Sequence, residues 1–98
     1  MWGEIMYNRE FQKLSQRQQQ FLLEWVEDNF TKSLELNFNW PAMEIKQIFS
    51  TLFFYVTRNQ FVCAMKKSNF QVAVFNRDYV FNVHPKSKAF VLYGMEDK

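Results

Sequence analysis

Glycine, proline, cysteine and histidine are all scarce in this chain. Its 98 residues include two Gly, two Pro, one Cys and one His. So few Gly and Pro residues argue against a loop-rich or disordered chain. The lone Cys63 excludes an internal disulfide, which favours a reducing compartment. We therefore expect a folded protein with a cytoplasmic location.

Long apolar stretches are also missing. Charged or amide residues interrupt every apolar run before the roughly 20 residues that a membrane span needs. Residues 1–6 lack the basic start and the apolar stretch of a secretory signal. We expect no membrane as a partner. The sequence leaves open whether Met1 or Met6 is the natural start.

Groups that could perform catalysis do not converge in the sequence. Cys63 and His84 fall on different predicted elements, and no Gly-rich phosphate loop is present. Glu24, Glu27 and Asp28 share one predicted helix, where an acidic solvent-exposed face is a commoner explanation than a cation site. We expect no catalytic residue, no metal site and no cofactor, and therefore a protein that is not an enzyme.

Aromatic residues, in contrast, are abundant. The chain is 48% hydrophobic and 19% aromatic, and Phe alone supplies twelve residues. A chain of this length can enclose one hydrophobic core. We expect a single domain over residues 1–98, with flexible ends at residues 1–8 and 95–98.

The charged residues are distributed unevenly along the chain. Residues 1–40 carry four basic and six acidic side chains, a balance of −2. Residues 41–98 carry eight basic and four acidic side chains, a balance of +4. Such asymmetry is typical of a protein with one end facing a polyanion, and also of a solvated basic face without a partner.

A capping box marks the start of the first predicted helix. The hydroxyl of Ser15 can accept from the free amides of the first turn, and Gln18 can return a bond to the cap. Apolar residues at helical spacing follow as far as Phe30, where we expect the helix to end. Phe11 and Leu14 are expected to pack beside it, in a helical turn or in extended chain.

Two further helices are predicted in the middle of the chain. Pro41 suits the first turn of a helix, because its missing amide costs nothing there. Apolar residues at helical spacing extend that helix over 41–53. After a short turn, Thr57 and Gln60 form a second capping box that opens a helix over 58–68.

Strand patterns appear in three places. Apolar and polar side chains alternate within residues 31–40, as in a short strand; the apolar ones are Leu34, Leu36 and Phe38. The β-rich runs at 72–75 and 79–83 flank turn residues at 76–78 and predict a hairpin. The apolar segment 89–93 is expected to return as another strand or to lie across the core.

This order of elements predicts an α+β fold, namely a small winged-helix-like domain with three helices and a two- or three-stranded antiparallel β-sheet. In domains of that type the third helix enters the major groove of double-stranded DNA, and the hairpin lies against the neighbouring backbone.

The DNA-binding hypothesis assigns a role to each polar residue of the third helix. We expect an outward face formed by Asn59, Gln60, Cys63, Lys66 and Lys67. Amide side chains can pair with adenine, and basic side chains near phosphates give a salt-dependent attraction. The other predicted contacts are Arg58 at the helix start, Arg77 at the tip of the hairpin, and Lys86 and Lys88 just beyond it.

An alternative hypothesis starts from the aromatic residues, which exceed what a small core absorbs. The surplus comes from Trp2, Tyr7, Trp25, Phe38, Trp40, Phe53, Phe54, Tyr55, Phe90 and Tyr93. Exposed aromatic patches indicate a partner surface. The chain would then be a protein-interaction module with a host or phage protein as its partner, or an inhibitor of a host protein, and it could act as a homodimer. Its predicted partner-binding residues are Trp2, Tyr7, Trp25 and Trp40.

Several short segments between residues 40 and 87 carry a likeness to a known group. They include Ile45-Lys46-Gln47-Ile48-Phe49, Phe54-Tyr55-Val56-Thr57-Arg58-Asn59-Gln60-Phe61, Ala64-Met65, Phe70, Phe81-Asn82-Val83 and Lys86-Ser87. This part of the chain resembles small winged-helix-like proteins of phages and mobile elements of Gram-positive bacteria. It departs from their pattern at Pro41-Ala42-Met43 and at His84. The resemblance implies a cytoplasmic binding protein, either a transcription regulator or an inhibitor of host defence proteins.

Overall fold

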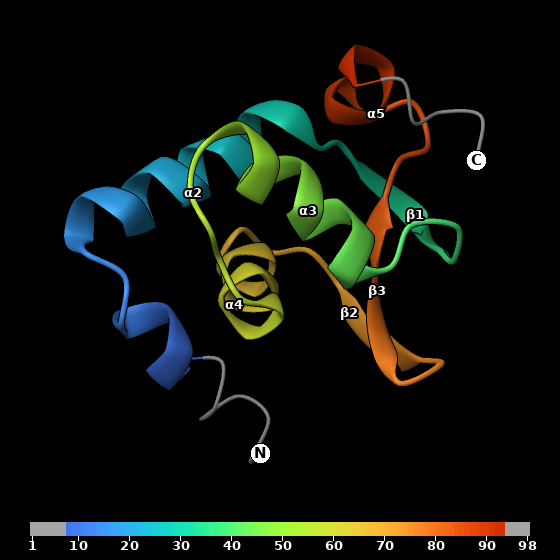
Figure 1. Cartoon of the computed structure of the whole chain (residues 1–98). Helices are drawn as coiled ribbons and strands as arrows, with labels where there is room; N and C mark the ends of the chain where they lie inside the picture. The colour runs from blue at the N-terminus through green and yellow to red at the C-terminus, as the bar shows by residue number, and fades with distance from the viewer. Residues whose placement is uncertain (1–7, 94–98) are drawn as a thin grey trace.

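The computed structural model describes residues 8–93, in which helices pack against a three-stranded antiparallel sheet (Figure 1). A helical segment at residues 8–12 comes first. The elements that follow are α2 (Gln16–Asn29), β1 (Lys32–Asn37), α3 (Ala42–Leu52), α4 (Arg58–Lys67), β2 (Val72–Phe75), β3 (Asp78–Val83) and α5 (Lys88–Leu92). The α+β class is confirmed, and the sheet has the larger of the two predicted strand numbers.

Both predicted capping boxes are present. Gln18 N donates to Ser15 Oγ over 3.1 Å, and Ser15 N donates to Gln18 Oε1 over 3.0 Å. Thr57 and Gln60 exchange the same two bonds at the start of α4. These bonds satisfy amides that have no partner inside the helix. Pro41 was expected within the first turn of α3 and is instead its N-cap residue.

Strand β3 lies at the centre of the sheet, in the order β1-β3-β2. A two-residue turn joins β2 to β3, and both of its residues, Asn76 and Arg77, have positive φ, at 51° and 63°. This is the conformation of a type I′ turn, whose twist matches that of the flanking strands. The predicted turn was one residue too long, because Asp78 already belongs to β3.

A wide bulge interrupts the pairing of β1 with β3. Lys32 lies opposite Val83 and Asn37 lies opposite Phe81, so the intervening residues of β1 face Asn82 alone. The buried side chain of Asn82 fills the gap, since its amide donates to Ser33 O and accepts from Gln71 N. The bulge leaves the predicted strand in place but interrupts its alternation.

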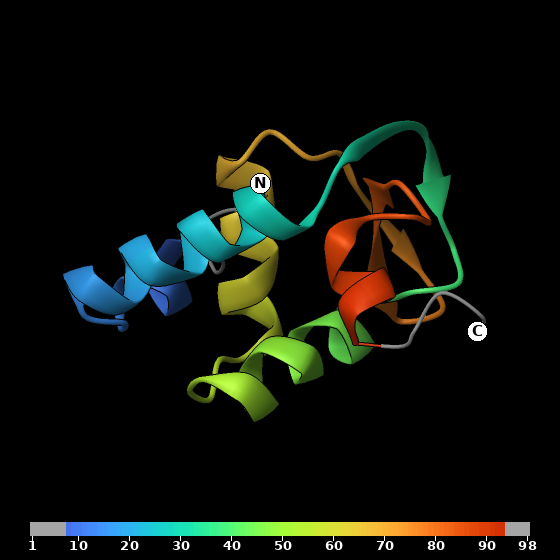
Figure 2. The ribbon, with the colours of Figure 1, turned by 90° about the horizontal axis from the view of Figure 1, so that it is seen from above.

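Helix α4 occupies the middle of the molecule. Figure 2 shows it crossing between α2 and α3, with the sheet to one side. All residues from Gln60 to Met65 are buried. The helix ends at Lys67, one residue before the predicted end, with Asn69 in the left-handed region at φ 69° and Phe70 N donating to Met65 O. Left-handed asparagine is a common helix stop, because its short polar side chain tolerates that conformation.

The expected helix count is wrong, and the final apolar segment does not form a strand. The described chain adds α5 and the helical residues 8–12 to the three predicted helices. Segment 89–93 was expected as a strand or as chain across the core, and it is mostly helical. Phe90 of α5 inserts into the core, with its ring 5.6 Å from Phe30 and 5.4 Å from Trp40. A helix places this one ring inward and leaves Val91 and Leu92 exposed.

Asp78 links three elements at one end of the sheet. Its Oδ2 accepts from Met43 N in the first turn of α3, over 3.2 Å. Pro41 provides no side-chain cap for that helix, so the carboxylate of Asp78 replaces it from across the fold. Its Oδ1 lies 3.6 Å from the guanidinium of Arg58, which also donates to Arg77 O.

The hairpin turn provides a test of this backbone geometry. We expect Arg77→Gly to stabilise the protein by about 1 kcal/mol, because only glycine adopts positive φ without a steric cost. Arg77→Ala removes the same side chain but keeps Cβ, so it should give no such gain. Urea unfolding of the three proteins measures the difference. Equal stability of the two variants would contradict the turn geometry.

Candidate functional site

Two of the residues expected on the outer face of α4 are buried. Gln60 Nε2 donates to the carbonyl of Glu10 over 2.9 Å, and Cys63 Sγ lies 3.4 Å from Asn8 Oδ1. Gln60 is 7% exposed and Cys63 is 2% exposed. The prediction that they face outward is wrong, because the helical segment 8–12 covers this side of α4. Neither side chain can reach the edge of a base in this structure.

The basic side chains near α4 separate into two groups. Arg58 begins the helix and is held by Asp78 and the carbonyl of Arg77, while its guanidinium lies 5.3 Å from the ring of Tyr79. Lys66 and Lys67 end the same helix, eight and nine residues further on, which is roughly 12 to 14 Å at the rise of an α-helix.

Other predicted DNA contacts differ in exposure. Asn59 is half-buried, whereas Arg77, Lys86 and Lys88 are exposed. Lys86 lies in the β3–α5 connection, and Lys88 is the first residue of α5. Within α4, the buried middle of the helix separates Arg58 from Lys66 and Lys67.

Trp25 and Trp40 were expected on a partner surface and are core residues instead. Trp25 is 8% exposed and packs edge to face on Phe49 at 5.3 Å, and Trp40 is 6% exposed and stacks on Phe90. Large rings lose most water contact when they can reach the core, which is the favourable outcome. The other two predicted residues, Trp2 and Tyr7, lie outside the described part of the chain, as do the predicted flexible ends at 1–8 and 95–98 apart from residue 8, which is helical.

Other aromatic residues do form a surface, at the end of α3. A groove of about 400 Å³ separates the first half of α2 from the α3–α4 connection. It is lined by Arg17, Gln18, Phe21, Leu52, Phe53 and Phe54, and we call it the aromatic groove. Phe21, Leu52 and Phe53 are each 44–46% exposed. Exposed apolar side chains that adjoin one another distinguish this place from scattered surface residues.

Ring contacts fix the floor of the aromatic groove. The ring of Phe21 lies 4.8 Å from Phe53 and 6.1 Å from Phe54, and Phe49 lies beneath at 5.0 Å from Phe54. Tilted and edge-to-face pairs of this kind are favourable beyond the area they bury. The floor is therefore continuous with the core, while its upper edges face solvent.

The chain after α3 folds back along one side of the groove. Val56 N donates to Ser50 Oγ over 3.1 Å, which holds the extended residues 54–57 against the last turn of α3. Tyr55 is consequently turned outward and is 69% exposed, with Lys46 Nζ 4.4 Å from the centre of its ring. The cation over the ring gives this tyrosine a fixed position on the surface.

Sequence reasoning found part of this site. Phe53, Phe54 and Tyr55 belong to the surplus of aromatic residues, but Phe21 was missed. The signal was present, because Phe21 stands beside Leu22 and one turn before Trp25 on the same helix. Only the position of α3 decides that Leu22 is buried whereas Phe21 stays at the surface.

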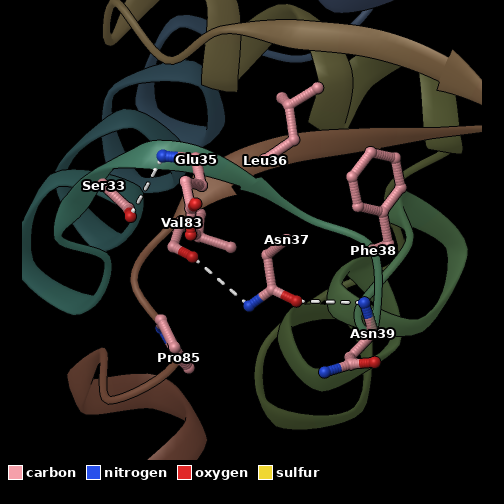
Figure 3. Close-up of a pocket in the computed structure, with 8 residues that line it drawn as sticks. All are labelled: Ser33, Glu35, Leu36, Asn37, Phe38, Asn39, Val83 and Pro85. Carbon is pink, nitrogen blue, oxygen red and sulfur yellow. Dashed lines mark hydrogen bonds between the residues drawn. The ribbon is translucent and has the colours of Figure 1, made fainter.

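A second hollow lies along β1 and contains more polar groups. Figure 3 shows its lining, with the side chain of Asn37 between the backbone of Val83 and that of Asn39. The Asn37 amide donates to Val83 O over 3.3 Å and accepts from Asn39 N over 3.0 Å. Both ends of this amide are therefore engaged by the backbone, and the hollow offers little convergent polar chemistry to a ligand.

Within residues 8–93, no group of three or more His, Cys, Asp or Glu side chains is arranged to hold a metal ion. No helix in the same range is long and apolar enough to cross a membrane.

Burial raises the pKa of the Cys63 thiol, although Lys67 and Lys66 act in the opposite direction. The thiol is thus protonated and shielded, which disfavours nucleophilic chemistry.

The chain matches no protein-family model, no curated protein and no solved structure at a significant level.

The burial of Cys63 leads to a pH-dependent prediction. The unfolded thiol ionises above about pH 8.5 while the native thiol stays protonated, so the unfolded state binds fewer protons there and stability should fall as pH rises. The Cys63→Ala variant keeps every other titrating group but has no thiol. Its stability should therefore not show this part of the decrease with rising pH. Urea unfolding between about pH 8 and pH 10 measures both slopes. Identical slopes would show that the thiol is not desolvated.

Proposed function

We propose that this chain is a non-enzymatic protein-interaction module of winged-helix-like arrangement, which binds a partner protein through the aromatic groove. The observation that carries the proposal is the adjoining exposure of Phe21, Leu52 and Phe53 over a floor of core rings. Apolar surface that remains in water is unfavourable, and aromatic rings are enriched where proteins bind one another.

The winged-helix-like part of the proposal is supported by the order of the elements. A helix, a strand, two helices and a hairpin follow one another in α2, β1, α3, α4, β2 and β3. The first strand pairs with the second strand of the hairpin, which gives the order β1-β3-β2. The helical residues 8–12 and α5 would be additions to that arrangement.

The rim of the groove indicates the chemistry of the partner. Arg17 lines the groove beside its apolar residues and is exposed. A partner segment that inserts an apolar side chain against Phe21 and Phe53 would therefore gain from a carboxylate next to it. An amphipathic helix or an extended segment with one acidic residue beside its apolar anchor fits these requirements.

The groove is tested by a double substitution at its rim. We expect Leu52→Ser with Arg17→Glu to weaken partner binding by about tenfold or more, because it removes an apolar contact and reverses the rim charge. The matched control is Leu92→Ser with Lys88→Glu on α5, which makes the same changes at an exposed site away from the groove.

Immobilised wild-type protein, the groove variant and the control are compared in nuclease-treated extract, and a captured protein is then purified and titrated against all three. Binding by wild type and control with loss in the groove variant supports the proposal. Equal affinity of the purified partner for the groove variant and the control contradicts it.

Double-stranded DNA is a second candidate ligand. The observation in its favour is the basic excess of residues 41–98, together with exposed Arg77 at the hairpin tip and Lys67 at the end of α4. Hairpin tips of winged helices lie against the DNA backbone. Binding of this kind would rest on phosphate contacts, since Gln60 and Cys63 are buried.

Fluorescence anisotropy with random duplex DNA separates the two candidates. The protein-interaction proposal expects no binding even at low salt. Micromolar binding at low salt that falls steeply as salt is added, and that Lys67→Gln with Arg77→Gln weakens further, would favour DNA instead. The Leu52→Ser, Arg17→Glu variant is the control, because it changes residues other than Lys67 and Arg77.

A further inference from the structure

The outer edge of the sheet at β2 has unpaired backbone groups. In a hairpin with a two-residue turn, the flanking residues Phe75 and Asp78 form a hydrogen-bonded pair, as do Ala73 and Val80 two residues away. The N–H and C=O groups of Val72 and Val74 therefore point away from β3. Among residues 8–93 these groups have no hydrogen-bond partner.

This edge lacks the features that normally protect a strand from pairing. The strand reads Val-Ala-Val-Phe, without a charge, a proline or a bulge, and its own pairing with β3 has a regular register. Edge strands are usually shielded by lysine, proline or an irregular twist. Val74 is 74% exposed, so no side chain of the described residues covers the edge there.

The sheet face beside this edge is also apolar. Val80 is fully buried but lies outside the main core cluster, and strand alternation places it on the face opposite Phe81. On that side the rings of Phe38 and Phe75 pack 4.8 Å apart while remaining 52% and 40% exposed. Figure 3 shows Leu36 and Phe38 on the other side of the chain from Asn37. An apolar outer face therefore adjoins the unpaired edge.

We propose that β2 pairs antiparallel with β2 of a second copy of this chain, about a two-fold axis that passes beside Ala73. In this register Val72 lies opposite the partner's Val74, and Val74 lies opposite the partner's Val72. The outward N–H and C=O groups of both valines then form hydrogen bonds in both copies. A register shifted along the strand would leave some of these groups without a partner. The two sheets become one continuous sheet.

A second copy fits this edge because the edge is complementary to itself. Within β2, the outward N–H and C=O groups belong to Val72 and Val74, which are two residues apart. In an antiparallel copy the same two residues have the same spacing, so each faces the other. The same register sets Gln71 opposite the partner's Phe75, so residues 71–75 bring no like charges together. Ala73 faces its own equivalent at the axis, where its small side chain allows the strands to approach.

This pairing is independent of the aromatic groove. The hairpin meets the start of α3 through Asp78 and Met43, whereas the groove lies at the end of α3. Helix α3 has 11 residues, which is about 16 Å at the rise of an α-helix. Figure 1 and Figure 2 both place the hairpin and the α3–α4 connection on different sides of the molecule. A dimer would leave both grooves open.

A disulfide trap at the axis tests the register. Ala73 and its equivalent would form a non-hydrogen-bonded pair, with Cα atoms about 4.5 Å apart, within the range that a disulfide spans. Ala73→Cys should therefore form a covalent dimer under mild oxidation. Val74→Cys places its thiol opposite the partner's Val72 and should cross-link much less. The buried Cys63 of the wild-type protein provides the background.

Non-reducing electrophoresis after oxidation of dilute protein gives the result. A dimer that forms with Ala73→Cys and fails with Val74→Cys supports the proposed axis. Equal cross-linking of both variants, or stronger cross-linking of Val74→Cys, overturns it because another register or a random encounter would explain the bond.

The unpaired amide is tested separately by sedimentation across a range of concentrations. Val74→Pro removes an outward N–H that the hairpin does not use, so the fold should persist while the dimer dissociation constant rises by about tenfold or more. Val74→Ala keeps the N–H and is the matched control. Thermal unfolding confirms that both variants are folded.

Monomeric wild-type protein at every concentration overturns the proposal. So does a Val74→Pro protein that dimerises as well as Val74→Ala, since the association would then use another surface. Neither result bears on the aromatic groove, whose variants are measured against a different ligand.

Discussion

The fold depends on the burial of α4 from several sides. Every residue from Gln60 to Met65 is buried, and a helix of ten residues has little stability by itself. Its position is therefore set by the elements that cover it. Helices α2 and α3 pack on two sides, and residues 8–12 cover the side of Gln60 and Cys63. The polar groups on that side remain acceptable inside the protein because each has a partner there.

Burial of this helix decides which surfaces remain for binding. A winged-helix protein that reads DNA needs the outer face of its third helix, and here the middle of that face is covered. Two other features of the described residues lie at the two ends of α3. At one end the aromatic groove opens, and at the other Asp78 fastens the hairpin to the helix.

The aromatic content explains both the stability of the core and its incomplete closure. Phe49 contacts Trp25, Phe53 and Phe54 through tilted or edge-to-face pairs, and Phe90 joins Trp40 to Phe30 at the other side. A domain of 98 residues encloses only a limited volume. Rings that do not fit inside this volume remain at the edge of the core, where they contact both core residues and water.

The sequence by itself determined the features that depend on neighbouring residues. The capping boxes and the hairpin were predicted correctly, because each needs only a few adjacent side chains and backbone amides. The surplus of aromatic residues also indicated that some must be exposed. Only the tertiary structure decided which ones, since Trp25 and Trp40 entered the core while Phe21 and Phe53 did not. Burial depends on what packs against a side chain from distant parts of the chain. For the same reason the covering of Gln60 and Cys63 by residues 8–12, and the helical form of α5, could not be predicted from local pattern.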